Sequence, residues 1–187
     1  MRPAFLALVL LLWSGALLAQ SLSANDRALI DATRRNDIEA ARRLIAAGAS
    51  VNAQDDNRDS AFLVAGAEGR LEILKLTLQA GADLKSTNRY GGTALIPACH
   101  HGHIETVREL LKTAIDVNHV NRLGWTALLE TVILGDGGPT YTEIARLLIA
   151  GKANVNLADN QGVTPLAHVR QRGFREIASI LEAAGAR

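Results

Sequence analysis

The densest group of potential ligands in the sequence is the segment Cys99-His100-His101-Gly102-His103. Imidazoles this close together are suited to a transition metal ion or a haem iron. The cluster of His100, His101 and His103 therefore supports the hypothesis of a haem or metal carrier. The competing interpretation assigns these side chains to packing and to an exposed turn, and on that interpretation the protein has no cofactor.

The sequence gives little evidence for a catalytic site. Asp55, Asp56 and Asp59 cluster in a segment that reads as an exposed polar loop. Neither a Gly-rich phosphate loop nor a His-Glu-x-x-His or Gly-x-Ser-x-Gly motif occurs in the sequence. We therefore predict that the protein is not an enzyme.

The charge balance narrows the class of partner. Lys and Arg number 20 and Asp and Glu 19, which gives a formal net charge of +1 and argues against nucleic-acid binding. Hydrophobic residues make up 48% of the chain and aromatic residues only 4%. Ala and Leu supply most of this apolar content, which favours helices over sheet.

The first 19 residues have the pattern of a secretory signal peptide. A basic start is followed by the apolar run from Ala4 to Leu12 and by small residues that predict cleavage near Ala19. A membrane anchor is the competing interpretation, but the apolar segment is shorter than the roughly 20 residues that cross a bilayer. We expect a periplasmic or secreted protein without stable membrane association after cleavage. Cys99 is the single cysteine, so no internal disulfide can form.

Two sequence markers recur with one period. Thr93-Ala94-Leu95 and Thr126-Ala127-Leu128 are 33 residues apart, and Val51, Leu84 and Val117 have the same spacing. In both series the next step is 38 residues, which indicates a five-residue insertion. A shared period with a shared insertion indicates an internal structural repeat.

The sequence pattern predicts two short helices in each repeat. Thr93 is a predicted N-cap for the first helix of its repeat. The second helix is predicted from about Ile104 to Lys112, with an apolar stripe at Ile104, Val107, Leu110 and Leu111. Helices this short are marginal alone in water, so each repeat must bury its stripe against its neighbours.

Several motif blocks resemble the ankyrin-repeat family, in particular its small exported bacterial members. The blocks are Gly91-Gly92-Thr93-Ala94-Leu95, Gly102-His103-Ile104-Glu105 and Asp116-Val117-Asn118. The resemblance implies an all-α ankyrin-repeat solenoid over residues 25–187, with about five helix-turn-helix repeats and projecting β-turn loops. The implied repeats cover residues 25–55, 56–88, 89–121, 122–159 and 160–187, and a monomer is expected.

The resemblance also bears on the histidine cluster. His103 stands at the Gly-His position of the family, within the turn between helices, and Cys99 stands where the family has a packed alanine. His100 and His101 would then be exposed turn residues. The histidine that usually follows Thr-Pro-Leu in the family is absent, because its positions hold Leu63, Ile96, Leu129 and Ala167.

Partners of ankyrin arrays usually dock on the turn tips and on the inner face of the first helices. Transferred by position, this implies a partner-binding strip formed by Arg89, Tyr90, His100, Arg122, Leu123 and Trp125. Tyr, Trp and Arg are also the residue types most often found at binding hot spots. The competing interpretation of Trp125 is a local staple that packs onto the neighbouring turn.

The leading functional prediction is an exported, non-enzymatic adaptor that binds a partner protein through its concave face and turn tips. The resemblance further implies a supporting role in a periplasmic redox or catalase/haem system. Two alternatives stay open at this point. One is the haem or metal carrier that uses His100, His101 and His103, and the other is a secreted effector that binds host proteins.

Overall fold

The computed structural model describes residues 22–187, so the predicted signal peptide at residues 1–19 lies outside the described part. The described residues form helices and no strands, which confirms the all-α prediction. The ten helices are α1 (Ala24–Arg34), α2 (Ile38–Ala46), α3 (Ala61–Ala67), α4 (Leu71–Gln79), α5 (Leu95–His100), α6 (Ile104–Leu110), α7 (Ala127–Leu134), α8 (Pro139–Ala150), α9 (Pro165–Arg172) and α10 (Arg175–Ala183). Across residues 22–187 no helix has the length and apolar character needed to cross a membrane.

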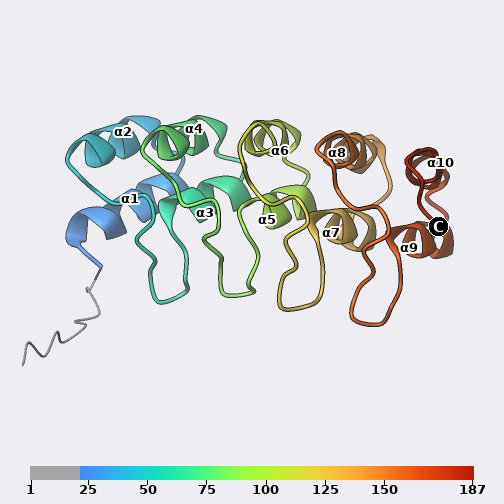
Figure 1. The fold of residues 1–187 in the computed structure, drawn as a ribbon. Coiled ribbons are helices and arrows are strands. Elements are labelled where there is room, and N and C mark those ends of the chain that lie inside the picture. The colour runs from blue at the N-terminus through green and yellow to red at the C-terminus, as the bar shows by residue number, and fades with distance from the viewer. Residues whose placement is uncertain (1–21) are drawn as a thin grey trace, which may run out of the picture.

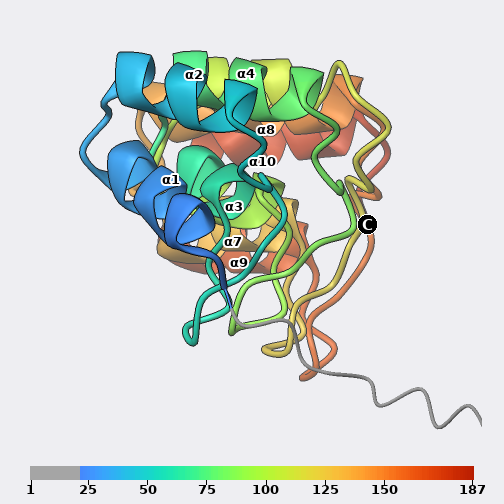
Figure 2. The ribbon, with the colours of Figure 1, turned by 90° about the vertical axis from the view of Figure 1, so that its left-hand side faces the viewer.

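The helices form two parallel rows, as Figure 1 shows. The inner helices α1, α3, α5, α7 and α9 make one row, and each contacts the next. The outer helices α2, α4, α6, α8 and α10 make the second row in the same way. Long loops project beyond the inner row on one edge, at a steep angle to the helices when the stack is viewed from its end (Figure 2). We call the ends of these loops fingertips, at residues 55–59, 88–92, 121–125 and 159–163.

Stacked apolar side chains form a continuous core between the rows. At one equivalent position in successive inner helices, Phe62, Leu95, Leu128 and Leu166 are all buried almost completely. Since each helix has at most 12 residues, its stability depends on this burial against the neighbouring repeats.

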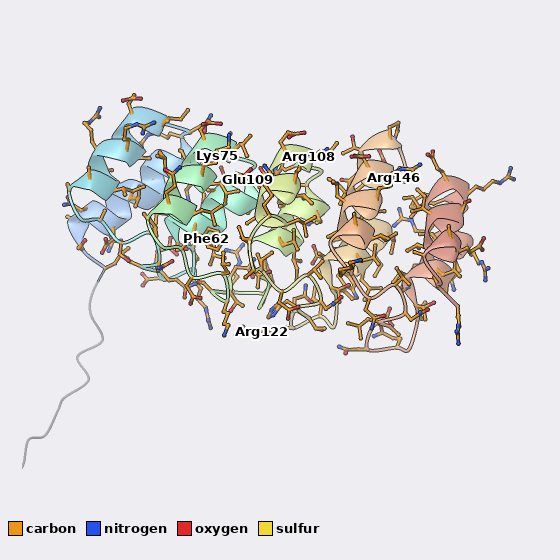
Figure 3. All side chains as sticks on the ribbon, turned by 45° about the horizontal axis from the view of Figure 1, so that its top comes forward. Phe62, Lys75, Arg108, Glu109, Arg122 and Arg146 are labelled. Atoms are coloured by element: carbon orange, nitrogen blue, oxygen red, sulfur yellow. The ribbon has the colours of Figure 1, made fainter. Side chains whose placement is uncertain are left out.

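The outer row is joined by ion pairs that run from one repeat to the next. Arg108 of α6 lies 3.2 Å from the Glu143 carboxylate of α8, and Arg146 of α8 lies 2.9 Å from Glu176 of α10. Figure 3 shows Arg108 and Arg146 on the outer helices, far from Arg122 at the fingertip edge. Exposed pairs of this kind contribute at most about 1 kcal/mol each, so the apolar core dominates the stability of the stack.

The N-caps of the inner helices follow one rule with one exception. The hydroxyls of Ser60, Thr126 and Thr164 each accept a hydrogen bond from the backbone N–H three residues further on. The prediction of the same cap at Thr93 is wrong, because α5 begins at Leu95 and the buried Thr93 hydroxyl has no hydrogen-bond partner among the described residues.

Pro97 explains the missing cap. In the other four repeats, the carbonyl of the capping residue accepts from the N–H four residues on, but Pro97 occupies that place in the third repeat and has no N–H. The carbonyl of Thr93 accepts instead from Ile96 N at 3.2 Å, which tightens the first turn and takes the N–H that the hydroxyl would need.

A pair of matched substitutions tests this difference between the caps. Thr126→Val is expected to lower the free energy of unfolding by about 1 kcal/mol, because it removes a working N-cap. Thr93→Val is expected to leave it unchanged or to raise it by about 1 kcal/mol, because it replaces an unpaired buried hydroxyl by a methyl group. Urea denaturation followed by circular dichroism measures both, and equal losses for the two variants would contradict the assignment.

The five-residue insertion lengthens the turn between α7 and α8, which begins at Pro139. The last repeat holds this turn in place. The Arg172 guanidinium donates to the backbone carbonyls of Val132, Ile133 and Gly135 at the end of α7, and it lies over the Phe174 ring at 4.6 Å. The chain passes Phe174 so closely that a Cβ on Gly137 would lie 2.3 Å from that ring.

Candidate functional site

The fingertip at residues 121–125 is organised by the side chain of Asn121. Its Oδ1 accepts hydrogen bonds from the backbone N–H groups of Leu123 at 2.9 Å and Trp125 at 3.0 Å. Gly124 lies between them with φ of +83°, a conformation that favours glycine. This turn fixes the direction in which Leu123 and Trp125 project from the fingertip.

The preceding fingertip repeats this arrangement around Asn88, whose Oδ1 accepts from Tyr90 N at 2.9 Å and Gly92 N at 3.0 Å. The two fingertips are also joined to each other. The backbone N–H of Arg122 donates to Tyr90 O at 3.0 Å, and its guanidinium donates to Arg89 O at 2.8 Å. Tyr90 and Leu123 are therefore presented side by side on a fixed frame.

A pocket of about 460 Å³ lies between these two fingertips and the inner helices α5 and α7. We call it the finger pocket. Its volume is within the range of small-ligand and side-chain sites. It is lined by Asp59, Ala67, Asn88, Arg89, Tyr90, Gly92, Ile96, Pro97, His100, His101, Asn121, Leu123, Trp125, Glu130 and Leu134.

The structure brings five of the six predicted strip residues together around the finger pocket: Arg89, Tyr90, His100, Leu123 and Trp125. The sixth, Arg122, does not line the pocket, because its side chain reaches back to the neighbouring fingertip. Their role in partner binding stays a prediction.

The rim of the finger pocket exposes large side chains to solvent. Tyr90 is 54% exposed and Leu123 is 50% exposed, while Trp125 is half-buried. The guanidinium carbon of Arg89 lies 4.9 Å from the centre of the Tyr90 ring, a cation–π contact. Trp125 forms part of the pocket wall, and its role as a staple on the neighbouring turn stays a prediction.

The base of the finger pocket holds a carboxyl group that the sequence interpretation missed. The Glu130 side chain, on α7, is only 9% exposed. Its Oε1 accepts from Asn121 Nδ2 at 2.9 Å, and its Oε2 lies 3.7 Å from His100 Nδ1. A comparison of the repeats in register could have identified Glu130 from the sequence. The equivalent positions in the other repeats hold Val64, Pro97 and His168, so an acidic residue there is an exception.

Burial dominates the electrostatics of this pair. It raises the pKa of Glu130 to about 7, and the hydrogen bond from Asn121 offsets that rise only in part. Burial, helped by the neighbouring His101, lowers the pKa of His100 below its ordinary value of 6.5. Both shifts favour the neutral forms, so Glu130 and His100 do not form a strong ion pair at neutral pH.

The three histidine rings of the cluster follow one another, and the centres of the His101 and His103 rings are 5.9 Å apart. His101 Nδ1 lies 2.7 Å from the carbonyl oxygen of Ala67, and the rings of His100 and His101 are 4.5 Å apart. The His103 ring packs on the preceding repeat, where a Cβ on Gly69 would lie 2.6 Å from its Nδ1. No group of three or more His, Cys, Asp or Glu side chains within residues 22–187 is arranged to hold a metal ion. Haem or metal binding stays a prediction.

The remaining chemical candidates take part in the scaffold. Cys99 is fully buried, which raises the pKa of its thiol and disfavours the reactive thiolate. Asp55 and Asp59 both accept hydrogen bonds from the Arg34 guanidinium, at 2.9 Å and 3.0 Å. The aspartate cluster thereby ties the first fingertip to α1.

Short helices stacked in pairs, with fingertips along one edge and a pocket between two of them, define a solenoid repeat protein with an extended binding face. A family model described as three copies of the ankyrin repeat matches residues 29–121 and 62–137, and one for the single ankyrin repeat matches residues 123–160. The chain therefore belongs to the ankyrin-repeat family. This fold is typically a non-enzymatic module for protein–protein interaction, so its partners are in general proteins.

Solved structures of the same family resemble most of the chain. An ankyrin repeat domain from Acinetobacter baumannii AYE has 58% sequence identity and a TM-score of 0.85, over 89% of this chain and 87% of that one. The ankyrin repeat protein EF0377 has 44% identity and a TM-score of 0.80, over 82% of this chain and 78% of its own.

A shorter match links the chain to the "Putative ankyrin repeat protein YahD" of Escherichia coli K12. The two are 48% identical over 58 residues, which is 31% of this chain. The matched segment spans only 29% of that relative's length, so it supports the family and no finer likeness.

Proposed function

We propose that the protein is an exported, non-enzymatic adaptor that binds a segment of a partner protein in the finger pocket. The main supporting observation is the convergence of Tyr90, Leu123 and Trp125 on one pocket, with the first two about half exposed. Exposed aromatic and aliphatic side chains beside a concave pocket are the usual anchors of protein–protein recognition.

The signal-peptide pattern of residues 1–19 supports export to the periplasm or beyond. A partner in that compartment would then be the first to search for, and the resemblance to small exported ankyrin-repeat proteins suggests components of a periplasmic redox or catalase/haem system as candidates.

Affinity capture from a periplasmic extract tests this function. The wild-type protein is expected to retain a partner that the double variant Tyr90→Ala/Trp125→Ala loses, because the variant removes both aromatic walls of the finger pocket. Mass spectrometry of the retained proteins identifies the partner. Circular dichroism must show the same helix content in both proteins, so that lost binding is not lost folding.

The last fingertip offers a matched control. Gln161 and Val163 stand at the positions equivalent to Tyr90 and Trp125 in their fingertips, but neither lines the finger pocket. The variant Gln161→Ala/Val163→Ala is expected to capture the same partner as the wild type. If the finger-pocket variant captures the same proteins as the wild type, or if the wild type captures nothing, the proposed binding site is wrong.

A further inference from the structure

The finger pocket combines apolar walls with one unfilled acceptor at its base. Tyr90, Leu123 and Trp125 form walls without a formal charge, and the Glu130 carboxyl lies among the lining residues below them. Glu130 Oε1 is satisfied by Asn121, but Oε2 accepts no hydrogen bond from the residues that the structure describes. Such an oxygen, on a nearly buried side chain that lines a pocket, is a position for a ligand's donor group.

The charges around Glu130 leave it without a cation. Asp59, the other acidic residue of the lining, is bonded to Arg34. Over residues 22–187, no Lys or Arg lies within ion-pair distance of Glu130, and its neighbour His100 favours the neutral form. Arg89 belongs to the rim, where it stacks on Tyr90.

We propose that the finger pocket binds a cationic side chain, lysine or arginine, on a segment of the partner protein, with Glu130 as the counter-ion. This inference rests on the proposed function and specifies the chemistry of the partner. The aliphatic stem of such a side chain would lie along Leu123 and Trp125, and its cationic head would reach Glu130 Oε2. The faces of Tyr90 and Trp125 add cation–π attraction.

An apolar side chain of the same length fits this pocket less well. It would pack on the same walls equally well, but it would exclude water from Oε2 and offer no hydrogen-bond donor in its place. An acidic side chain would place a second carboxylate beside Glu130. A lysine or arginine side chain satisfies both, because its apolar stem packs on the walls and its head donates to the base and pairs with the carboxylate.

The pH dependence of binding follows from the same geometry. A bound cation favours the ionised form of Glu130, whose pKa in the empty pocket is about 7, so binding below that pH releases a proton. Affinity is expected to rise by up to about tenfold per pH unit below pH 7 and to level off above it. Protonation of His100 at low pH acts in the same direction, since it places a positive charge beside the ligand.

Other ionisable groups on the elements around Glu130 are already engaged. Tyr141 on α8 donates to His100 O, His168 on α9 pairs with Asp159, and Arg172 on α9 binds the end of α7. Arg89 and His101 also line the pocket, where Arg89 stacks on Tyr90 and His101 Nδ1 lies 2.7 Å from Ala67 O. The cationic Arg89 competes there with a cationic ligand.

Short peptides that differ at one side chain test the inference. The probes are acetyl-Leu-Lys-Leu amide and its analogues with norleucine or glutamate at the centre, where norleucine keeps the stem of lysine without the charge. Nuclear magnetic resonance follows the Trp125 indole N–H, assigned by its loss in Trp125→Phe. The lysine peptide is expected to shift this signal and to bind at least about tenfold more tightly than the norleucine peptide.

Two variants connect that difference to Glu130. Glu130→Gln keeps an acceptor for Asn121 and is expected to abolish the preference for lysine while norleucine binding stays equal or improves. Arg89→Gln, on the exposed rim, is expected to tighten lysine binding about two- to threefold because it removes a competing charge. Circular dichroism checks that both variants keep the wild-type helix content.

Several outcomes would overturn the inference. Equal binding of lysine and norleucine, a preference for glutamate, or no binding of any peptide at the Trp125 signal would each do so. The capture experiment decides the proposed function separately. Suppose that a partner is lost with Tyr90→Ala/Trp125→Ala but is bound equally well by Glu130→Gln. The proposed adaptor function would then stand, and the proposed cationic anchor would be wrong.

Discussion

Replacing Phe62 by alanine is expected to lower the free energy of unfolding by about 3–5 kcal/mol. Phe62 is fully buried and is among the largest side chains of the core. Its removal leaves a cavity between the helices of the second repeat, and neighbours held by their own repeats can close that cavity only in part. Urea denaturation followed by circular dichroism measures the loss.

The chain provides its own control for this substitution. Leu95, Leu128 and Leu166 occupy the same position in the other inner helices, so Phe62→Leu introduces the side chain that three repeats already use. It is expected to cost about 1–2 kcal/mol, well below the alanine variant. Equal losses for the two variants would show that the second repeat tolerates a cavity at this position.

The Phe62→Ala variant is also expected to unfold in two steps. Because each repeat contacts only its neighbours, damage in the second repeat weakens repeats 1 and 2 while repeats 3–5 keep their own contacts. The finger pocket lies mainly on repeats 3 and 4, so the Trp125 fluorescence is expected to change at a higher urea concentration than the circular dichroism. Coincident transitions would contradict this separation.

Glu130 is expected to destabilise the folded protein above pH 7, and Glu130→Gln to remove that effect. Burial raises the pKa of Glu130 from 4.5 to about 7, so between these values the unfolded chain loses a proton that the folded chain keeps. The free energy of unfolding therefore falls as pH rises through this window. The variant, which cannot ionise, is expected to be more stable by about 2 kcal/mol at pH 8, after allowance for solvent screening in the open pocket.

The difference between wild type and variant isolates this group. His100 has a lowered pKa, so its contribution to stability is lost as pH falls below 6.5, and Asp26, Asp55 and Asp159 act similarly in more acid solution. Both proteins contain these groups, so their effects largely cancel in the difference. Thermal unfolding at pH 5, 6, 7 and 8 measures it, and a difference that stays constant across this range would show that Glu130 ionises normally.

The repeat could be predicted from the sequence because its markers are local and periodic. Residues such as Leu95 and Leu128 recur at a fixed spacing, and burial of short amphipathic helices then requires stacking. The Thr93 cap was predicted wrongly because its hydrogen bond depends on Pro97, four residues further on, rather than on the capping residue itself. A local preference was overridden by the lack of one N–H.

The candidate site could be predicted in part for the same reason. Tyr90 and Trp125 were identified because the fingertip positions are set by the repeat. Glu130 was missed because its burial arises from tertiary packing, and its hydrogen-bond partner, Asn121, belongs to the fingertip nine residues earlier rather than to α7. An acid in an apolar helix becomes informative only when the repeats are compared in register.

The contact of Arg172 with the end of α7 has a consequence for the order in which the parts of the molecule fold. The carbonyls of Val132, Ile133 and Gly135 receive their donors from a residue almost forty positions later in the chain. In a chain that folds from its amino end, at the ribosome or on export, the first three repeats can stack while the end of α7 still lacks these hydrogen bonds. The end of α7 is therefore completed only when the last repeat has folded against it.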